Sequence, residues 1–364
     1  MSYILKIGVA VPAYRYSQLD LVKPVQSLYP EDSPARRKIA ALFARSAIDY
    51  RYSALPDFGC DGNGAFYPFF GRSFCLPDVG KRMAVFKAMS APLGQKTVES
   101  LFNGENHFAL SQVTHLIAVS CTGISAPGLE ILLAEKLGLP QTVQRIAVNF
   151  MGCYAAFHGL KIADLIARSD PKALVLMVCV ELSTLHLRAD ESDDNLLSSA
   201  LFGDGAAAVL VKGQAARLPA LKIAGFQSML IGEAAGDMQW NVASDGFRMN
   251  LTAMIPAHVQ RHMRSFFEDI HKRRRLQRSD ISHFAIHPGG KKILESFAAS
   301  LDIDTQSLEA SFWTLRHFGN MSSPSVLFVL KRIWENQLES AGNIFSAAFG
   351  PGLTVETAVL QVAD

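Results

Sequence analysis

The chain has 364 residues, 49% of them hydrophobic, with 35 basic and 33 acidic side chains. A chain of this length can bury roughly three quarters of the surface that it exposes when unfolded, so a large core is possible. The formal net charge of +2 gives no overall field that would attract nucleic acid or an anionic membrane, and small-molecule chemistry is the better expectation.

The N-terminal residues predict a first β-strand and no export signal. Lys6 and Pro12 interrupt the apolar run before it reaches the length of a signal-peptide core. No stretch of the sequence approaches the roughly 18 uninterrupted apolar residues that a membrane-spanning helix needs. We therefore expect a cytoplasmic protein with no membrane span.

Further along the chain, apolar β-rich runs alternate with stretches of helical period, and this alternation predicts an α/β fold with buried strands. The predicted elements are strands at 116–119, 145–148 and 174–178 and helices at 128–137 and 159–167. Pro127 is expected in the first turn of the first helix, and Gly138 at its end.

A pattern that occurs twice predicts two equivalent halves, residues 1–215 and 216–364. A strand that begins near His115 is followed 37 residues later by Gly152 and Cys153. A similar strand near His283 is followed 36 residues later by Gly319 and Asn320. Both halves then close with a Phe-Gly-x-Gly turn into an apolar strand. An ancient duplication explains this order, and chance similarity among short strands is the alternative.

Two halves that pack about a pseudo-twofold axis would bring Cys153, His287 and Asn320 together. Cys153 lies between a predicted strand and a predicted helix, where the helix dipole and a neighbouring imidazolium would lower the pKa of the thiol. Such a thiolate could hold an acyl group covalently, while the His and Asn side chains stabilise a developing oxyanion. Taken singly, the three residues would also fit a buried cysteine, a histidine under a loop and a helix cap.

Five segments resemble the signatures of the chalcone synthase family, the type III polyketide synthases. They are Val-Asn-Phe-Met-Gly-Cys at 148–153, Ala-Leu-Phe-Gly-Asp-Gly-Ala at 200–206, Ala-Ile-His-Pro-Gly-Gly at 285–290, Gly-Asn-Met-Ser-Ser at 319–323 and Phe-Gly-Pro-Gly-Leu-Thr at 349–354. The resemblance covers residues 37–362. It implies a thiolase-like αβαβα layered fold made of two duplicated halves, a homodimer, and iterative use of acyl-CoA and malonyl-CoA as substrates without a cofactor.

The resemblance also implies roles for single residues. Cys153 would be the nucleophile, His287 and Asn320 the pair that supports decarboxylation, and Phe202 a gate between a coenzyme A tunnel and the cavity. Coenzyme A phosphates would bind Lys38 and Arg45 on a predicted helix at 36–49. A third basic position of that helix in the family corresponds to Ala41 in this chain, which removes part of the phosphate contact.

By the same alignment, six residues line the substrate cavity: Cys121, Thr122, Ala126, Ser183, His186 and Met249. Met249 replaces an aromatic side chain with a flexible one, so a long aliphatic starter fits better than an aromatic one. The stretches 238–242 and 246–249 resemble the bacterial alkylpyrone and alkylresorcinol branch. The predicted enzyme is thus an acyltransferase that makes a pyrone or resorcinol type product.

Several alternatives share parts of this pattern. A ketoacyl synthase of the kind that starts fatty acid synthesis has the same three catalytic groups but takes malonyl groups from an acyl carrier protein. A chalcone or stilbene type synthase would use an aromatic starter. A cysteine hydrolase, which also uses Cys, His and Asn, would release free acid. A thiolase-fold partner subunit would have no activity, although retention of all three polar groups argues against it.

Metal and nucleic-acid signals are weaker. The five cysteines, Cys60, Cys75, Cys121, Cys153 and Cys179, contain no C-x-x-C pair, so we expect neither disulfides nor zinc. His258 and His262 stand four residues apart but lack the glutamate of an H-E-x-x-H motif, and we interpret them as surface histidines. The basic run at 272–275 fits the C-terminus of a helix, where cations complement the dipole.

Overall fold

The computed structural model describes residues 1–59, 65–67, 69, 76–102, 108–214, 219–337 and 342–363. Cys60 and Cys75 lie outside these residues, and so does the expected boundary between the halves at residue 215. The three other cysteines, Cys121, Cys153 and Cys179, are buried free thiols.

The strands among the described residues form one large mixed sheet and two small pairs, β2 with β3 and β9 with β10. They are β1 (Tyr3–Ala10), β2 (Tyr14–Ser17), β3 (Tyr50–Ser53), β4 (His115–Ser120), β5 (Gln144–Asn149), β6 (Leu174–Leu182), β7 (Asp204–Lys212), β8 (Ala220–Leu230), β9 (Met238–Ala243), β10 (Gly246–Leu251), β11 (Ile281–Ile286), β12 (Asn343–Gly350) and β13 (Thr354–Ala363).

The large sheet has the order β11-β12-β13-β8-β1-β7-β6-β4-β5 and consists of two arms with the same plan. In the arm β4-β6-β7-β1, the first pair is parallel and the next two are antiparallel. The arm β11-β12-β13-β8 has the same sequence of pairings. The arms join where Tyr3 and Ile4 pair with Lys222 and Leu221. The repetition predicted from the sequence is therefore present in the topology, with β5 added at one edge.

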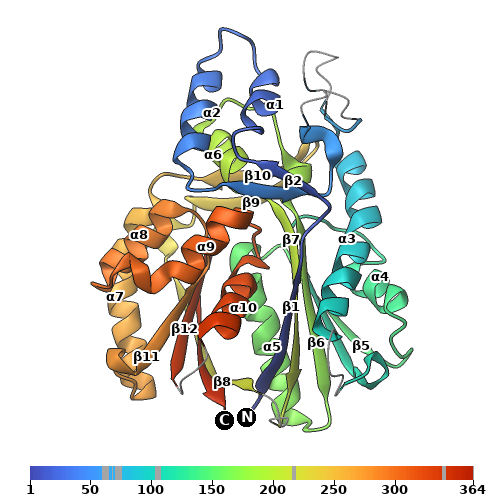
Figure 1. Ribbon diagram of the computed structural model, residues 1–364, viewed down its shortest axis with the longest axis vertical. Helices are drawn as coiled ribbons and strands as arrows, with labels where there is room; N and C mark the ends of the chain where they lie inside the picture. The colour runs from blue at the N-terminus through green and yellow to red at the C-terminus, as the bar shows by residue number, and fades with distance from the viewer. Residues whose placement is uncertain are drawn as a thin grey trace.

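Helices cover both faces of each arm (Figure 1). They are α1 (Val22–Ser27), α2 (Pro34–Arg45), α3 (Val79–Phe102), α4 (Leu129–Lys136), α5 (Ala155–Ser169), α6 (Asp193–Leu201), α7 (Ile255–Arg274), α8 (Lys291–Ser300), α9 (Glu309–Phe318) and α10 (Ser325–Gln337). Within the described part of the chain, none is long and apolar enough to cross a membrane.

The helices α5 and α10 lie between the two arms, with α3 and α4 outside one arm and α7 and α8 outside the other (Figure 1). The central layer is tight because α5 presents small side chains such as Ala155 and Ala163, both fully buried, to the strands on either side. The expected order of layers is therefore observed, and it places the N-termini of α5 and α10 at the same end of the molecule.

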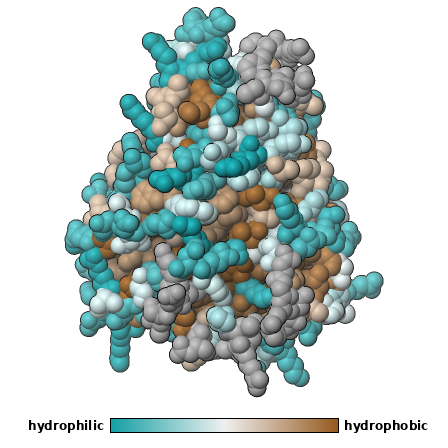
Figure 2. All heavy atoms as spheres, viewed as in Figure 1, coloured by the Kyte–Doolittle hydropathy of each residue, from teal (hydrophilic) through white to brown (hydrophobic). Residues whose placement is uncertain are grey.

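A cap of smaller elements lies at that end, formed by α1, α2, α6 and the strand pairs β2–β3 and β9–β10 (Figure 1). Both chain termini lie at the opposite end. On the face drawn in Figure 2, hydrophilic side chains dominate the outer parts and apolar ones gather in the middle, over the central layer. The space between the cap and the central helices is where the site is found.

Two local predictions differ from the structure. Pro127 precedes α4 instead of opening it, because Gly128 is the N-cap and Leu129 the first helical residue. The helix 36–49 is shorter than expected, since α2 ends at Arg45. Gly138 does end α4 with a φ of +61°, a conformation that glycine adopts without strain.

The prediction that His258 lies on the surface is wrong. The residue as a whole is 8% exposed and lies on the buried face of α7, whereas His262 is partly exposed. The prediction failed because His258 is paired with Asp237, 21 residues earlier in the chain, and the helical pattern does not reveal such a contact.

Candidate active site

Three chain segments that are distant in sequence meet below the cap. Cys153 lies in a 3₁₀ turn, Gly152–Tyr154, between β5 and α5. His287 directly follows β11, and Asn320 lies between α9 and α10. All three side chains line one cavity. The Cys153 Sγ is 4.0 Å from both the Oδ1 and the Nδ2 of Asn320, so the thiol and the amide face each other.

Backbone contacts fix the position of Asn320. Its N–H donates to the carbonyl of Leu201, and its own carbonyl accepts from the N–H of Gly203. Gly319 has a φ of +68°, and a Cβ there would lie 2.8 Å from the Leu201 carbonyl oxygen, so the two loops approach this closely only with glycine.

The amide of Asn320 is oriented by its neighbours. Its Oδ1 accepts from the backbone N–H of Ser322 at 2.8 Å, and this contact identifies Nδ2 as the donor on the other side. The Nδ2 donates to the carbonyl of Gly289 at 3.3 Å, in the loop that follows His287. The donor therefore points into the space between Cys153 and the loop of His287.

His287 is buried, 1% exposed, and neither ring nitrogen has a hydrogen-bond partner among the residues that the structure describes. Burial lowers the pKa of His287 to about 3, because the charged imidazolium would lose its hydration. The imidazole is therefore neutral at physiological pH, with one N–H donor and one free acceptor available to a substrate.

The thiolate of Cys153 that the sequence predicts is not stabilised in this structure. Desolvation by burial raises the pKa of the Cys153 thiol to about 11; a hydrogen bond from Ser322 opposes this shift, the buried Glu181 adds to it, and Asn320 opposes it. The expectation of a lowered pKa was wrong for two reasons. His287 is neutral, and the sulfur lies in a 3₁₀ turn that precedes α5 within a fully buried environment.

Glu181 is a residue of the site that the sequence analysis did not identify. It is the penultimate residue of the buried strand β6 and is fully buried itself, which raises its pKa by desolvation. Its carboxyl group accepts from the Ser323 hydroxyl at 2.6 Å, the Thr122 hydroxyl at 2.8 Å and the backbone N–H of Cys121. Glu181 thus holds the segments after β4 and after Asn320 in place. A single acidic residue in an otherwise apolar strand was the signal for it.

The structure places five of the six predicted cavity residues on the cavity wall: Cys121, Thr122, Ser183, His186 and Met249. The sixth, Ala126, does not line it, since it lies in an exposed part of the loop before α4. Phe202 also lines the cavity, beside the backbone contact between residues 201–203 and Asn320.

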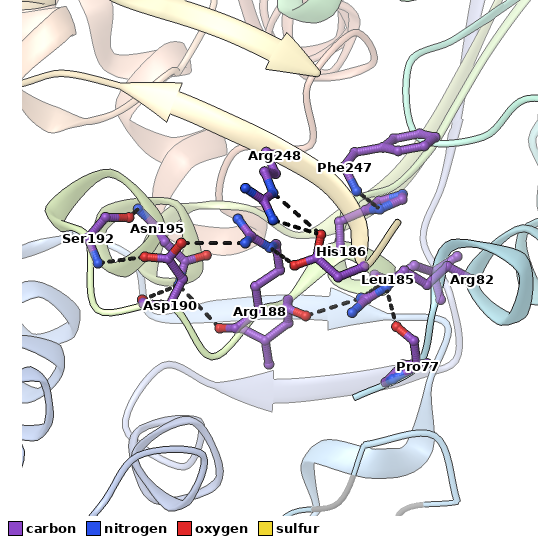
Figure 3. Close-up of polar contacts among 12 residues, drawn as sticks. Pro77, Arg82, Leu185, His186, Arg188, Asp190, Ser192, Asn195, Phe247 and Arg248 are labelled. Carbon is purple, nitrogen blue, oxygen red and sulfur yellow. Dashed lines mark hydrogen bonds and ion pairs between the residues drawn. The ribbon is translucent and has the colours of Figure 1, made fainter. Parts of the chain in front are cut away.

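Polar contacts hold the β9–β10 hairpin over the cavity (Figure 3). The backbone N–H of Phe247 donates to His186 Nδ1 at 3.2 Å, and the Nε2 of His186 donates to the carbonyl of Thr122 at 2.8 Å. Arg188 pairs with Asp245 at the turn of the hairpin at 2.9 Å. The hairpin is therefore tied to the segments after β4 and β6, and it forms one fixed wall of the cavity.

Lys38 and Arg45 lie outside the cavity on an exposed face of α2. The Nζ of Lys38 is 2.6 Å from the carboxylate of Asp193 at the start of α6. Ala41 is exposed between them, and Arg37 on the same helix is exposed as well.

Family models match nearly the whole chain. The model for the N-terminal domain of chalcone and stilbene synthases matches residues 1–215, and the one for their C-terminal domain matches residues 222–363. The chain belongs to the chalcone and stilbene synthase family. These enzymes are the type III polyketide synthases, acyltransferases that catalyse condensation, so the family predicted from the sequence motifs is confirmed.

The fold of this synthase family is also confirmed by solved structures. PKS-I from the brown alga Ectocarpus siliculosus superposes with a TM-score of 0.91 at 29% identity, over 100% of this chain and 98% of that one. The layered arrangement described above is therefore the thiolase-like fold.

Sequence relatives within the family carry different names. The chain is 30% identical to the alpha-pyrone synthesis polyketide synthase-like Pks18 of Mycobacterium tuberculosis, over 98% of this chain and 90% of that protein. It is 29% identical to the 3,5-dihydroxyphenylacetyl-CoA synthase of Amycolatopsis balhimycina, over 98% and 91%. Because these identities are nearly equal, they assign the chain to no branch of the family. The chain spans only 11% and 12% of two matching polyketide synthases of Dictyostelium discoideum.

Proposed function

We propose that this type III polyketide synthase loads an acyl group from acyl-CoA onto Cys153 and extends it with units from malonyl-CoA. The observation that carries the proposal is the arrangement of the buried thiol of Cys153, the amide of Asn320 at 4.0 Å and the unpartnered imidazole of His287 on one cavity wall. Membership of the family supports the same roles.

Loading requires a base, because a pKa of about 11 keeps the thiol of Cys153 protonated at neutral pH. His287 has a free acceptor nitrogen and takes the proton as the sulfur attacks the carbonyl carbon of the acyl-CoA thioester. The C–S bond to coenzyme A then breaks, and the departing thiolate takes the proton from the imidazolium. The products are acyl-Cys153 and free coenzyme A, with His287 neutral again.

Extension begins with the loss of carbon dioxide from malonyl-CoA. The C–C bond to the carboxylate breaks, and its electron pair moves onto the thioester oxygen as an enolate. The Nδ2 of Asn320 and the N–H of neutral His287 donate to this oxygen. The enolate carbon then attacks the acyl carbonyl on Cys153, and the C–S bond breaks, which leaves a diketide on coenzyme A and a thiolate ready for the next cycle.

A long aliphatic starter is the proposed substrate class, with a pyrone or resorcinol type product of the alkylpyrone and alkylresorcinol branch. The cavity continues from Cys153 toward apolar side chains of the cap, among them Leu21, Val25 and Phe58. Met249 also lines the cavity, and its flexible side chain leaves room for an irregular chain. An aromatic starter, as in chalcone or stilbene synthases, is the alternative.

We assign supporting roles to three further residues. Phe202 would act as the gate of the cavity, since its backbone is paired with Asn320 and its ring stands in the wall. Lys38 and Arg45 would bind the phosphates of coenzyme A on the exposed face of α2. A phosphate there would compete with Asp193 for Lys38.

The proposed assembly is a homodimer. In the described part of the chain, β5 is the edge strand of its arm, and edge strands are ready to pair with another chain. Nearby apolar side chains are exposed, with Ile124 at 52% and Leu165 at 65%. Sedimentation of the purified protein as a monomer at micromolar concentration would contradict this assignment.

The deciding experiment incubates purified protein with acyl-CoA starters of graded chain length and malonyl-CoA, without any acyl carrier protein. We expect mass spectrometry to detect pyrone or resorcinol type products, with the highest yield from long aliphatic starters. A product that forms only when an acyl carrier protein is added would favour the ketoacyl synthase alternative. Release of free acid without consumption of malonyl-CoA would favour a hydrolase.

A pair of cysteine variants tests the nucleophile. Cys153→Ala is expected to abolish both the acyl-enzyme adduct and product formation, because no other group in the mechanism can hold the starter. Cys179→Ala is the matched control, since Cys179 is a buried thiol of β6 that does not line the cavity. Wild-type turnover in Cys153→Ala would contradict the proposal.

A further inference from the structure

A second group of polar side chains lies apart from the cavity, between α7 and the 3₁₀ turn Gly232–Ala234 that precedes β9. Glu233, His258 and His262 each offer a ligand atom there, and these atoms lie within 4.8 Å of one another. The Oε1 of Glu233 is 3.1 Å from the Nε2 of His262 and 3.9 Å from the Nδ1 of His258. The two histidines project from the same face of α7 because they are four residues apart.

The state of His258 is fixed by a fourth residue, Asp237. The Nε2 of His258 is 3.0 Å from the Oδ2 of Asp237, and because a carboxylate only accepts, Nε2 carries the proton. In the neutral ring the Nδ1 is then an acceptor with a free lone pair, yet it is buried and has no hydrogen-bond partner in the described part of the chain. A buried hydrogen-bond acceptor without a partner is unfavourable. A Lewis acid bound among these three residues would take up the lone pair of the Nδ1.

We propose that Glu233, His258 and His262 bind one divalent transition-metal ion, zinc being the natural test case, with Asp237 orienting His258. Ligand atoms about 2 Å from a tetrahedral zinc ion lie about 3.4 Å apart, and the observed separations of 3.1 and 3.9 Å lie on either side of that value. Two imidazole nitrogens and one carboxylate oxygen select zinc and similar metals over calcium or magnesium. The fourth position would hold water.

The proposal differs from the expectation from sequence that no metal binds. An H-E-x-x-H motif places its glutamate on the same helix, but here the glutamate comes from a separate turn, 25 residues before His258 (258 − 233). The carboxylate–histidine contact from Asp237 matches the arrangement that usually orients metal-bound histidines and strengthens them as ligands.

One contact competes with the metal. The Nη1 of Arg261 is 3.3 Å from the same Oε1 of Glu233. Both side chains are more than half exposed, and an exposed ion pair contributes little, so Arg261 can turn into solvent when a metal binds. The alternative is that these residues form only a network of ion pairs around Glu233.

The position of the site suggests what the metal does. Asp237 also accepts from the Thr252 hydroxyl at 2.7 Å, and it immediately precedes Met238, the first residue of β9 and part of the cavity wall. A bound ion would therefore tie α7 to the base of the β9–β10 hairpin. This role is structural and does not depend on the proposed condensation chemistry.

The test uses the full chain without a polyhistidine tag, treated with a chelator and then titrated with cobalt(II) and with zinc(II). We expect one equivalent of metal per chain, a visible cobalt spectrum typical of four-coordinate nitrogen and oxygen ligands, and a higher unfolding temperature with zinc. His262→Gln and Glu233→Gln, at partly exposed positions, should weaken zinc binding at least tenfold and remove the shift in unfolding temperature. Asp237→Asn should weaken it 10- to 100-fold.

His271→Gln is the matched control, because His271 lies on the same helix but outside the group. It should bind zinc as the wild type does. If the wild type binds no metal, or binds it no more tightly than His262→Gln, the group is an ion-pair network and the proposal is wrong. Circular dichroism tests whether each variant is folded. Metal binding is measured without any turnover assay, so failure of the metal proposal can be distinguished from failure of the proposed condensation activity.

Discussion

Two buried histidines on the same cavity wall, His186 and His287, differ in how their nitrogens are used. Burial lowers the pKa of each to about 3, so both are neutral. His186 has a partner on each nitrogen, the carbonyl of Thr122 and the N–H of Phe247, and its ring stacks on Phe247 with centroids 4.2 Å apart. By contrast, no described residue forms a hydrogen bond with either nitrogen of His287.

The comparison shows which histidine is available for chemistry. A buried polar group without a hydrogen-bond partner destabilises the folded chain. An unpartnered group that faces a cavity is therefore best explained by a ligand that forms the hydrogen bond when it binds. Both nitrogens of His186 form hydrogen bonds within the protein, and the residue acts as a clamp between the hairpin and the segment after β4. The nitrogens of His287 can find a hydrogen-bond partner in a substrate that enters the cavity.

The largest expected effect follows from removing the unpartnered ring. His287→Ala should lower the rate of malonyl-CoA decarboxylation by about 100- to 1000-fold, since one donor to the developing oxyanion is lost. Its free energy of unfolding at neutral pH should stay within about 1 kcal/mol of the wild type, because no hydrogen bond of the protein is broken. Product analysis and urea denaturation measure the two quantities. A strongly destabilised variant would show that the ring has a structural role.

His186→Ala should behave in the opposite way. It removes the partners of the Phe247 N–H and the Thr122 carbonyl, both buried, and should reduce the free energy of unfolding by about 3 kcal/mol. We expect the starter preference to broaden as the hairpin loosens, while Cys153 still becomes acylated in the folded fraction. Urea denaturation and mass spectrometry of the acyl-enzyme test this. Unchanged stability would remove the distinction between the two histidines.

A third effect concerns pH and applies to both rings. Between the folded pKa of about 3 and the unfolded pKa near 6.5, the unfolded chain binds a proton that the folded chain does not, so stability falls as the pH falls through this window. At pH 5 each ring accounts for about 2 kcal/mol of that loss. His287→Ala should therefore lose about 2 kcal/mol less than the wild type between pH 7 and pH 5. Parallel pH profiles would contradict the burial of a neutral ring.

The sequence predicted much of this wall but not the state of its groups. Cys153, His287 and Asn320 line one cavity, as their motifs and the predicted strand ends indicated. This could be predicted because the order of strands and helices follows from local patterns. The pKa of Cys153 depends on how completely other segments cover it, and no local pattern reports that burial.

The residues that were missed have partners from other elements. Glu181 holds Thr122 and Ser323, which lie 59 and 142 positions away, and His258 is paired with Asp237, 21 positions away. Ala126 was assigned to the wall by alignment, but its loop turns outward in this chain. Such long-range contacts require the three-dimensional arrangement.

The smallest expected effect sharpens the account of His186. Phe247→Leu keeps the backbone N–H that His186 accepts but removes the stacked ring, and should cost about 1 kcal/mol of unfolding free energy. In a double-mutant cycle, Phe247→Leu and His186→Ala should show a coupling energy of about 1 kcal/mol. Either substitution alone already removes the stacking between the two rings, so the second one costs no further stacking energy. A coupling near zero would mean that the hydrogen bonds alone orient His186. The clamp would then depend on the hairpin backbone, and any apolar residue at position 247 would serve equally well.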